Sequence, residues 1–420
     1  MHRILAVTLA AFVCAPVAQA QTSPPTEMSE TLTLERALDL AFADSPGIGA
    51  ADAGVRAAEA QRRTAGLRPN PSVSVEVENV VGSGIYSGTR GAEVTAGLSL
   101  PLEMGGKRSA RIAVADTQTI RARLDIAVAR ADLRLRVTQA YNDGVATERR
   151  VGVARDQLRI ADEGMRAASV RVRAGRASPL EEQRADVARI NARAALAQAE
   201  RNAALARDNL ARLIGQVPSS LDTVWFDRVG SFGPFMAASA DGTLALALAE
   251  ADVSTANAQV RLARSQRVPD LTLSAGARRL EATNDVAAVF GVSVPFPLFN
   301  SGRANLDAAR AQKDQAESLR RVALLNARQA IAVAETDLAN AESNARTATG
   351  PALAAAVEAA RIARIGYREG KFGQLDLLEA ERTLAQTRVA AIDTVSAYHD
   401  AKARLERLTA RAPTEKEIQP

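Results

Sequence analysis

The two halves of this chain carry the same sequence pattern in the same order, and this repetition constrains the fold more than any other feature. RAGRASPLEEQRA at residues 173–185 aligns with REGKFGQLDLLEA at residues 368–380, and LSLPLEMGGKR at 98–108 aligns with VSVPFPLFNSGR at 292–303. The spacing between matched residues changes little from one pair to the next, as it does when a whole unit is copied. We therefore interpret the chain as a tandem duplication of one structural unit.

The duplication divides the chain into consecutive segments. We expect a signal peptide at residues 1–20, a first repeat at 21–215, a linker at 216–241, a second repeat at 242–410 and a disordered tail at 411–420. The linker interrupts the helical pattern and holds several of the few aromatic residues of the chain, which are Trp225, Phe226, Phe232 and Phe235. We expect these rings to pack on the outside of the helical part, with contact to a partner protein as the alternative.

The first twenty residues predict export of the protein. Arg3 precedes an apolar stretch, and Ala18–Ala20 supplies the small residues of a cleavage site. The apolar stretch is shorter than the about 20 residues that a membrane-spanning helix needs. Cys14 is the only cysteine, so cleavage after Ala20 leaves a mature chain without disulfides or thiolate metal ligands. Lipidation of Cys14 is the alternative, although the bulky residues that precede it disfavour this modification.

Each half predicts a helix, two strands, a long helix, a turn and a final helix. In the first half we expect helices at residues 32–66, 107–172 and 180–214, and in the second half at 242–266, 303–367 and 375–410. The 107–172 segment contains no proline, so as an α-helix it would be about 100 Å long at about 1.5 Å per residue. Aromatic residues make up only 3% of the chain, which favours long, closely packed, alanine-rich helices over a conventional globular core.

Strict alternation of apolar and polar residues predicts four strands. Residues 72–78 alternate in this way, and similar runs lie near 93–100, 271–277 and 288–294. Runs of this length can cross a bilayer as tilted strands, but four strands leave two open edges, which lipid does not tolerate. Three chains would supply twelve strands, an allowed even number. The predicted fold class is therefore a mixed α/β membrane protein, with a long α-helical coiled-coil barrel and a transmembrane β-barrel completed by trimerisation.

Several of these motifs resemble one known family. The opening LTLERALDLAFADSP, the doubled hairpin and the turn YREGKFGQLDLLEAERTL at residues 367–384 resemble the TolC-type outer-membrane efflux proteins. Within that family, LRPNPSVSVEVENV followed by LSLPLEMGGKR is similar to the branch that serves heavy-metal exporters of the cobalt–zinc–cadmium type. The resemblance implies a passive homotrimeric exit duct for divalent heavy-metal cations in the outer membrane of a Gram-negative bacterium. It also implies a periplasmic adaptor and an inner-membrane proton-driven pump as partners.

Two glycine-containing turns, at residues 173–180 and 368–375, predict the far ends of the helical part. Glycine permits the positive φ that a sharp reversal requires, so a plain turn is one interpretation. The resemblance adds contact with the adaptor, for which the candidate residues are Gly175, Ser178, Leu180, Gly370, Gly373 and Leu375.

Acidic residues open the helices that follow these turns. Glu181, Asp376 and Glu379 are favoured near a helix N-terminus by the macrodipole, so capping alone would explain them. The resemblance places them at a constricted periplasmic entrance that attracts cations, together with Tyr367, which matches the tyrosine of the family's closing network. Phe372 stands where a better-studied member of the family has an arginine, so we expect closure in this chain to depend more on packing than on a charge pair.

The sequence argues against metal binding, catalysis and nucleic-acid recognition. His399 is the only histidine after the signal peptide, and beside Asp400 we interpret it as a surface residue. It offers neither a set of zinc ligands nor a serine–histidine–carboxylate constellation, and we find no nucleotide-binding motif. The net charge is +5, but basic and acidic residues interleave along the helices rather than forming a basic patch. We therefore expect no dedicated metal site, no cofactor, no enzymatic activity and no nucleic-acid partner.

Three alternatives to a heavy-metal duct follow from the same features. An outer-membrane duct for drugs or other organic compounds would have the same fold. A periplasmic adaptor also contains a long helical hairpin, but it would have a single hairpin and no bilayer-length strands in each half. A coiled-coil scaffold without a pore would leave the amphipathic strands without a purpose.

Overall fold

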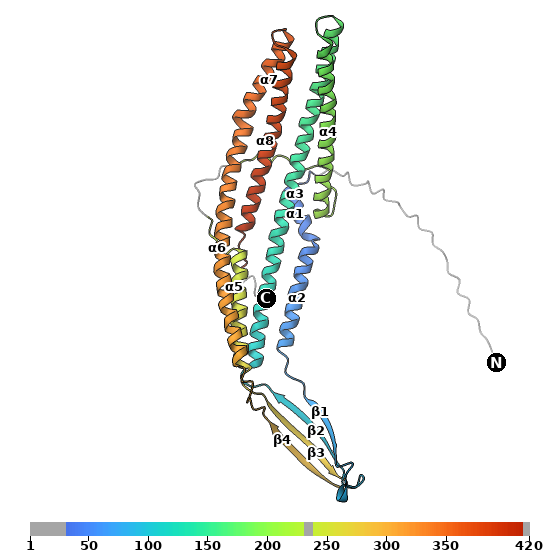
Figure 1. Cartoon of the computed structure of the whole chain (residues 1–420), viewed down its shortest axis with the longest axis vertical. Coiled ribbons are helices and arrows are strands. Elements are labelled where there is room, and N and C mark those ends of the chain that lie inside the picture. The colour runs from blue at the N-terminus through green and yellow to red at the C-terminus, as the bar shows by residue number, and fades with distance from the viewer. Residues whose placement is uncertain (1–30, 231–237, 415–420) are drawn as a thin grey trace, which may run out of the picture.

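The computed structural model describes residues 31–230 and 238–414, which form an elongated molecule with helices along most of its length and a small sheet at one end (Figure 1). The predicted signal peptide with Cys14 therefore lies outside the described residues. The same holds for Phe232 and Phe235 of the linker and for residues 415–420 of the tail.

The helices run along the long axis of the molecule (Figure 1). Their bounds are α1 (Leu34–Ala43), α2 (Pro46–Ala65), α3 (Lys107–Arg173), α4 (Pro179–Ile214), α5 (Leu244–Ser265), α6 (Arg303–Thr347), α7 (Leu353–Arg368) and α8 (Gln374–Leu408). Helix α3 has 67 residues and is about 100 Å long at about 1.5 Å per residue, as the sequence predicts. Both α2 and α4 pack against α3, one beyond the other along its length. In the same way α5 and α8 both pack against α6.

Two helices that the sequence predicts as continuous are interrupted beside prolines. The predicted helix 32–66 ends at Ala43 and a second helix begins at Pro46. Proline is tolerated at the first position of a helix, because the N–H of that residue has no hydrogen-bond partner within the helix. The predicted helix 303–367 is divided by η2, a π-helix at Ala348–Ala352 that contains Pro351. Proline removes a backbone donor and clashes with the preceding turn, which widens or kinks the helix there. Apolar periodicity continues through both breaks, so the periodicity alone predicted helices that were too long.

The strands form one antiparallel sheet in the order β1 (Ser72–Glu78), β2 (Glu93–Leu102), β3 (Leu271–Leu280) and β4 (Asp285–Ser293). The central pairing of β2 with β3 joins the two halves of the chain, while β1 and β4 are open edges. The last two strands are longer than the predicted runs near 271–277 and 288–294, because they reach residues 280 and 285. None of the helices in the described residues is both long enough and apolar enough to cross a membrane.

The two faces of the sheet differ in chemistry. Because side chains alternate along a strand, Ser74, Thr95 and Arg278 lie on one face of the sheet. Other hydroxyl and carboxylate side chains lie beside them on the neighbouring strands, so this face is polar. The opposite face is apolar and exposed to solvent in the single chain. Its members include Val73, Val75, Leu98, Leu100, Leu273, Phe290 and Val292. An exposed apolar face of this kind requires either lipid or another protein surface.

The largest buried cluster lies where α1, α3, α6 and α8 meet the segment that follows α4. Tyr141 and Phe226 are fully buried there, and the Trp225 ring centroid lies 4.2 Å from that of His399. The prediction that His399 is a surface residue is wrong, because its side chain is only 7% exposed and its Nε2 lies 2.9 Å from the carbonyl oxygen of Phe226. Burial lowers the pKa of His399 to about 4, so the imidazole is neutral at physiological pH.

Candidate functional site

The candidate site lies at the ends of the α3–α4 and α7–α8 hairpins, which are farthest from the sheet (Figure 1). Gly175 and Gly370 have φ of 66° and 75°, a left-handed conformation that strains any residue with a Cβ. The two turns close in the same way, since Arg176 N–H donates to the Arg171 carbonyl oxygen and Lys371 N–H donates to that of Gly366. This bonding satisfies the last carbonyls of each helix and reverses the chain within a few residues.

The helices that follow the turns begin with different caps. The Ser178 hydroxyl accepts the Leu180 N–H at 3.3 Å, and the Asp376 carboxylate accepts the Gly373 N–H at 3.0 Å. Capping of this kind stabilises a helix start, so the predicted capping role of Asp376 is present in the structure. Leu180 and Leu375 project beside these caps and are 55% and 63% exposed. Both hairpin ends therefore present an apolar side chain that no described residue covers.

Glu181 connects the two hairpins, which are distant in sequence. Its carboxylate accepts a hydrogen bond from the Tyr367 hydroxyl at 2.8 Å, and its carbonyl oxygen accepts one from the Gln374 side chain at 3.0 Å. Burial raises the pKa of Tyr367, and the adjacent Glu181 carboxylate raises it further, so the phenol keeps its proton and remains the donor. The structure thus brings together two of the predicted entrance residues.

The positive charge beside Glu181 comes from a residue that the sequence analysis did not single out. The Arg171 Nε lies 3.8 Å from a Glu181 carboxylate oxygen, and its guanidinium carbon lies 4.9 Å from the centroid of the Tyr367 ring. Arg171 thereby combines an ion pair with a cation–π contact. Phe372 packs instead against Gly366, where a Cβ would lie only 2.1 Å from the Phe372 ring. Packing and charge therefore both hold this end together.

Asp376 and Glu379 lie apart from the Glu181–Tyr367 contact. Both are exposed on α8, and no described residue of the other hairpin bonds to either side chain. Glu381 was not among the predicted residues, yet it is only 4% exposed and forms a bidentate pair with Arg364 of α7. Glu381 follows Leu377 and precedes Leu384 at the i, i+4, i+7 spacing of the apolar face of α8. A carboxylate in that pattern signals a buried ion pair.

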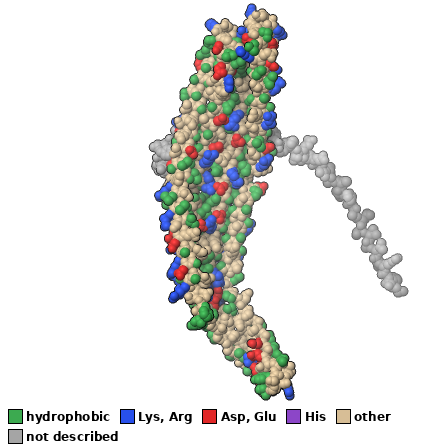
Figure 2. Space-filling model, in the orientation of Figure 1, with side chains coloured by type: hydrophobic (Ala, Val, Ile, Leu, Met, Phe, Trp, Pro, Cys, Tyr) green, Lys and Arg blue, Asp and Glu red, His purple; other side chains and the backbone are tan. Residues whose placement is uncertain are grey.

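The charged surface matches the interleaved pattern of the sequence. Figure 2 shows Lys, Arg, Asp and Glu side chains mixed over the helices, without a large patch of one sign on the face in view. Within residues 31–230 and 238–414, no group of three or more His, Cys, Asp or Glu side chains is arranged to hold a metal ion.

A family profile matches most of the chain. The profile described as "Outer membrane efflux protein" matches residues 37–216 and 240–411. The two matched segments contain both hairpins, the sheet and all of the predicted entrance residues.

Individual relatives and a solved structure agree with the profile. The chain is 32% identical to the cobalt-zinc-cadmium resistance protein CzcC of Cupriavidus metallidurans, over 92% of each chain. It is 30% identical to the nickel and cobalt resistance protein CnrC of the same bacterium, over 72% of this chain and 73% of the relative. The crystal structure of the outer membrane protein VceC from Vibrio cholerae superposes with a TM-score of 0.73 at 21% identity, over 90% of this chain and 96% of that one. This likeness confirms the predicted fold class of long helical hairpins joined to four strands.

Proposed function

Because this chain belongs to the outer membrane efflux protein family, we propose that it is the exit duct through which a tripartite system expels divalent heavy-metal cations. The observation that carries this proposal is the 32% identity over 92% of each chain with CzcC, a protein named for cobalt, zinc and cadmium resistance. CnrC, named for nickel and cobalt resistance, supports the same substrate class. The protein resides in the outer membrane, and its family and fold are those of transport proteins rather than enzymes.

The duct is a homotrimer in this proposal. A four-stranded sheet with open edges at β1 and β4 cannot face lipid alone, because the edge N–H and C=O groups would lack partners. Pairing β4 of each chain with β1 of the next closes a twelve-stranded barrel. The apolar face of the sheet then faces lipid and the face with Ser74, Thr95 and Arg278 lines the lumen, which suits passage of hydrated cations.

The chain itself supplies a passive pathway, and the energy comes from its partners. A periplasmic adaptor docks on the helix ends and connects the duct to an inner-membrane proton-driven pump. The matched turns and the exposed leucines support this assignment, because exposed apolar side chains on a rigid turn can insert into an apolar groove of a partner protein. The proposed contact residues are Gly175, Ser178, Leu180, Gly370, Gly373 and Leu375.

The entrance of the duct is formed by the same helix ends. Glu181 and Tyr367 hold the two hairpins together, so breaking this contact would allow the α7–α8 hairpin to move away and widen the entrance. Asp376 and Glu379 are exposed near the same end. In a trimer each becomes a ring of three carboxylates, which raises the local concentration of cations.

We also propose that residues 21–215 and 242–410 are duplicated units joined by the 216–241 segment. The shared order of helix, strands, hairpin and tip turn in both halves supports this division. The separate profile matches at 37–216 and 240–411 support it as well.

Complementation of a deletion strain tests the substrate class. The deletion should increase susceptibility to zinc, cobalt and cadmium but not to dyes or antibiotics, and the wild-type gene should restore resistance. The opposite pattern, with dyes and antibiotics affected and metals unaffected, would assign the duct to organic compounds instead.

The oligomer mass of detergent-extracted protein tests the assembly. A heat-sensitive trimer in the outer-membrane fraction is expected, because the barrel closes only when three chains pair. A monomer in that fraction would exclude the proposed barrel.

A further inference from the structure

Each junction between a helix and a strand has an exposed arginine, either in the connecting segment or in the first turn of the helix that follows. Arg68 lies between α2 and β1, Arg108 follows β2, Arg267 precedes β3 and Arg303 follows β4. Within the described ranges none of these four forms an ion pair with a carboxylate. Arg108 and Arg267 donate only to the carbonyl oxygens of Gly66 and Ser301. We refer to these four arginines as the junction collar.

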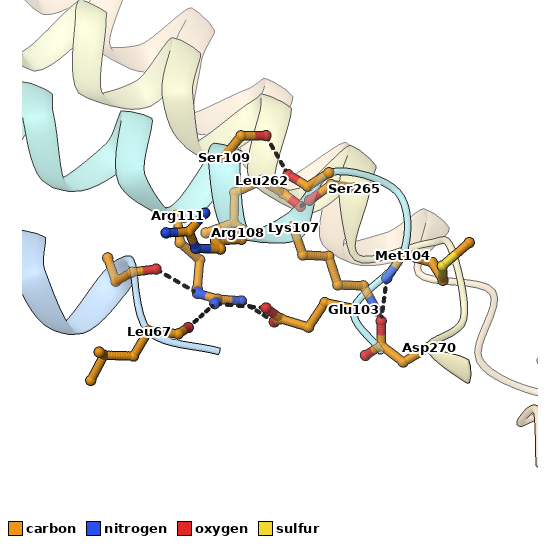
Figure 3. Close-up of polar contacts among 12 residues, drawn as sticks. Leu67, Glu103, Met104, Lys107, Arg108, Ser109, Arg111, Leu262, Ser265 and Asp270 are labelled. Carbon is orange, nitrogen blue, oxygen red and sulfur yellow. Dashed lines mark hydrogen bonds and ion pairs between the residues drawn. The ribbon is translucent and has the colours of Figure 1, made fainter. Parts of the chain in front are cut away.

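Lys107 and Arg111 lie at the same level but are neutralised, so they differ from the arginines of the collar. Lys107 Nζ lies 2.7 Å from Asp270, and Arg111 donates to Glu103 at 3.0 Å and to the Leu67 carbonyl oxygen at 3.1 Å (Figure 3). Asp270 also accepts the Met104 N–H at 3.0 Å. Hydrogen bonding from Arg111 lowers the pKa of Glu103 despite partial burial, so this carboxylate stays ionised in its pair. These carboxylates are engaged with Lys107 and Arg111, which leaves the collar charges uncompensated.

The long helices add to the positive field at the junction. Helices α3 and α6 begin after Gly106 and Gly302, with no side-chain cap and no acidic residue in the first turn. By contrast, α4 and α8 begin with acidic residues at the opposite end of the molecule. A helix N-terminus favours an anion, yet Arg108 and Arg303 lie in these first turns. Self-repulsion of this kind is relieved when an external anion binds.

Exposed apolar side chains lie directly beside the collar. Phe296 and Phe299, in the segment after β4, are 84% and 98% exposed. Phe296 also lines a cavity of about 320 Å³ together with Arg267, Gly302 and Asn305. The apolar face of the sheet continues into this segment, and Figure 2 shows a hydrophobic patch where the helices meet the sheet. Cationic and aromatic groups side by side at the end of bilayer-length strands match the boundary between acyl chains and headgroups.

We propose that the junction collar binds anionic phospholipids of the membrane leaflet that faces the helices. The phosphate lies between Arg267, Arg303 and the N-terminus of α6, and the acyl chains lie along Phe296 and the apolar face of the sheet. Guanidinium groups suit this ligand because they bind phosphate oxygens through paired, charge-assisted hydrogen bonds. The proposal rests on the outer-membrane location and is independent of which substrate the duct exports.

Native mass spectrometry of the full chain, titrated with dioleoyl phosphatidylglycerol or dioleoyl phosphatidylcholine, tests the proposal. The wild-type protein should retain more phosphatidylglycerol, and the preference should weaken with added salt. The double variant Arg267→Gln/Arg303→Gln should bind phosphatidylglycerol roughly twenty-five-fold more weakly, since each basic residue near a membrane contributes on the order of a fivefold effect. Its binding of phosphatidylcholine should be unchanged.

Two control variants distinguish a specific loss of phosphatidylglycerol binding from a general disturbance of the fold. Arg267→Lys/Arg303→Lys keeps both charges and should retain most of the preference. Arg201→Gln/Arg328→Gln removes two exposed arginines far from the junction and should behave as wild type. Equal binding of the two lipids by the wild-type protein, or an unchanged preference in Arg267→Gln/Arg303→Gln, would overturn the proposal. Complete displacement of phosphatidylglycerol by equimolar inorganic phosphate would also overturn it, because the site would then bind the free anion.

Discussion

The two halves of the molecule contain equivalent long helical arms, yet one arm is continuous and the other is jointed. Helix α3 runs for 67 residues without interruption, whereas the second half divides the same path into α6, the π-helix η2 and α7. Both arms begin after a left-handed glycine and end at a glycine turn. The main local difference is the Gly350–Pro351 pair, where Gly350 has a non-helical ψ of −105°. A change of a few residues is thus enough to interrupt the long helix in one of two similar units; we call this interruption the joint.

The surroundings of the joint suit motion of the α7–α8 hairpin. A cavity of about 540 Å³ lies beside it, lined in part by Thr349, Leu353 and Ile392. The hairpin has its own small buried cluster of Ala356, Ala360 and Leu384, separate from the main core. We therefore expect α7 and α8 to move together about Pro351 while α3 and α4 stay fixed.

Creating a matching joint in α3 should have the largest effect. Position 156 of α3 corresponds to Pro351 at the spacing that aligns the two tip turns. Asp156→Pro should destabilise the protein by about 3 kcal/mol or more, because a proline inside a helix removes a hydrogen bond and clashes with the preceding turn. Thermal unfolding of the extracted oligomer measures this change. Asp156→Ala is the control and should cost less than about 1 kcal/mol, since it removes only exposed ion pairs with Arg159 and Arg388. Equal stability of the two variants would show that α3 tolerates a joint.

The pH dependence of the free energy of unfolding tests the main buried cluster around His399, against which both long helical arms pack. His399 has a pKa of about 4 in the folded protein and 6.5 as its ordinary value, so the unfolded chain binds the proton first as the pH falls. Stability should therefore be fully present above pH 6.5 and decline by up to about 3 kcal/mol towards pH 4.

The variant His399→Gln isolates this contribution. Burial raises the pKa of the adjacent Asp400, which stabilises the folded state as the pH falls and so acts in the opposite direction. Asp400 is present in both proteins, so the difference in their thermal midpoints between pH 6.5 and 4 reports on His399. Parallel curves for wild type and His399→Gln would exclude a buried neutral histidine.

Local patterns and long-range contacts were not equally predictable from the sequence. The strands and α3 were predicted well, because alternation and proline-free helical spacing depend only on neighbouring residues. The prolines at positions 46 and 351 could have indicated the two helix breaks. The apolar periodicity continues through both positions, however, and it predicted continuous helices there. Helix ends follow from local chemistry, as the matched turns at Gly175 and Gly370 show.

The missed contacts depend on chain segments that fold back from far away. His399 is buried because Phe226, 173 residues earlier, packs against it, and no local pattern around His399 signals that contact. Tyr367 and Glu181 are 186 residues apart, and their proximity was expected only through the family resemblance. Arg171 supplies the positive charge at this contact, and only the structure shows that its side chain reaches Tyr367.

Loosening the contact between the two arms should have a smaller effect on stability and a clear effect on the duct. Tyr367→Phe removes the hydrogen bond to Glu181 at 2.8 Å and should cost about 1 kcal/mol. Because this bond joins the jointed arm to the rigid one, single-channel conductance in planar bilayers should increase. Tyr86→Phe, at the sheet end of the molecule, is the control and should leave conductance unchanged. A Tyr367→Phe channel that conducts as wild type would show that the contact does not restrict the entrance.

Restoring a continuous second arm should change stability least. Pro351→Ala returns a backbone donor to the helix, which is favourable, but it also frees the unfolded chain, which opposes the gain. The two contributions act in opposite directions, so the free energy of unfolding, measured by thermal unfolding, should change by less than about 1 kcal/mol.

The effect of Pro351→Ala on conductance should nevertheless be visible when it is combined with Tyr367→Phe. Tyr367→Phe releases the α7–α8 hairpin, and Pro351→Ala then removes the joint about which the hairpin would turn. The double variant should conduct less than Tyr367→Phe alone, a non-additive result because both changes act on one motion. If the double variant conducts as Tyr367→Phe does, the hairpin opens without the joint, and the interruption at Pro351 only accommodates the proline.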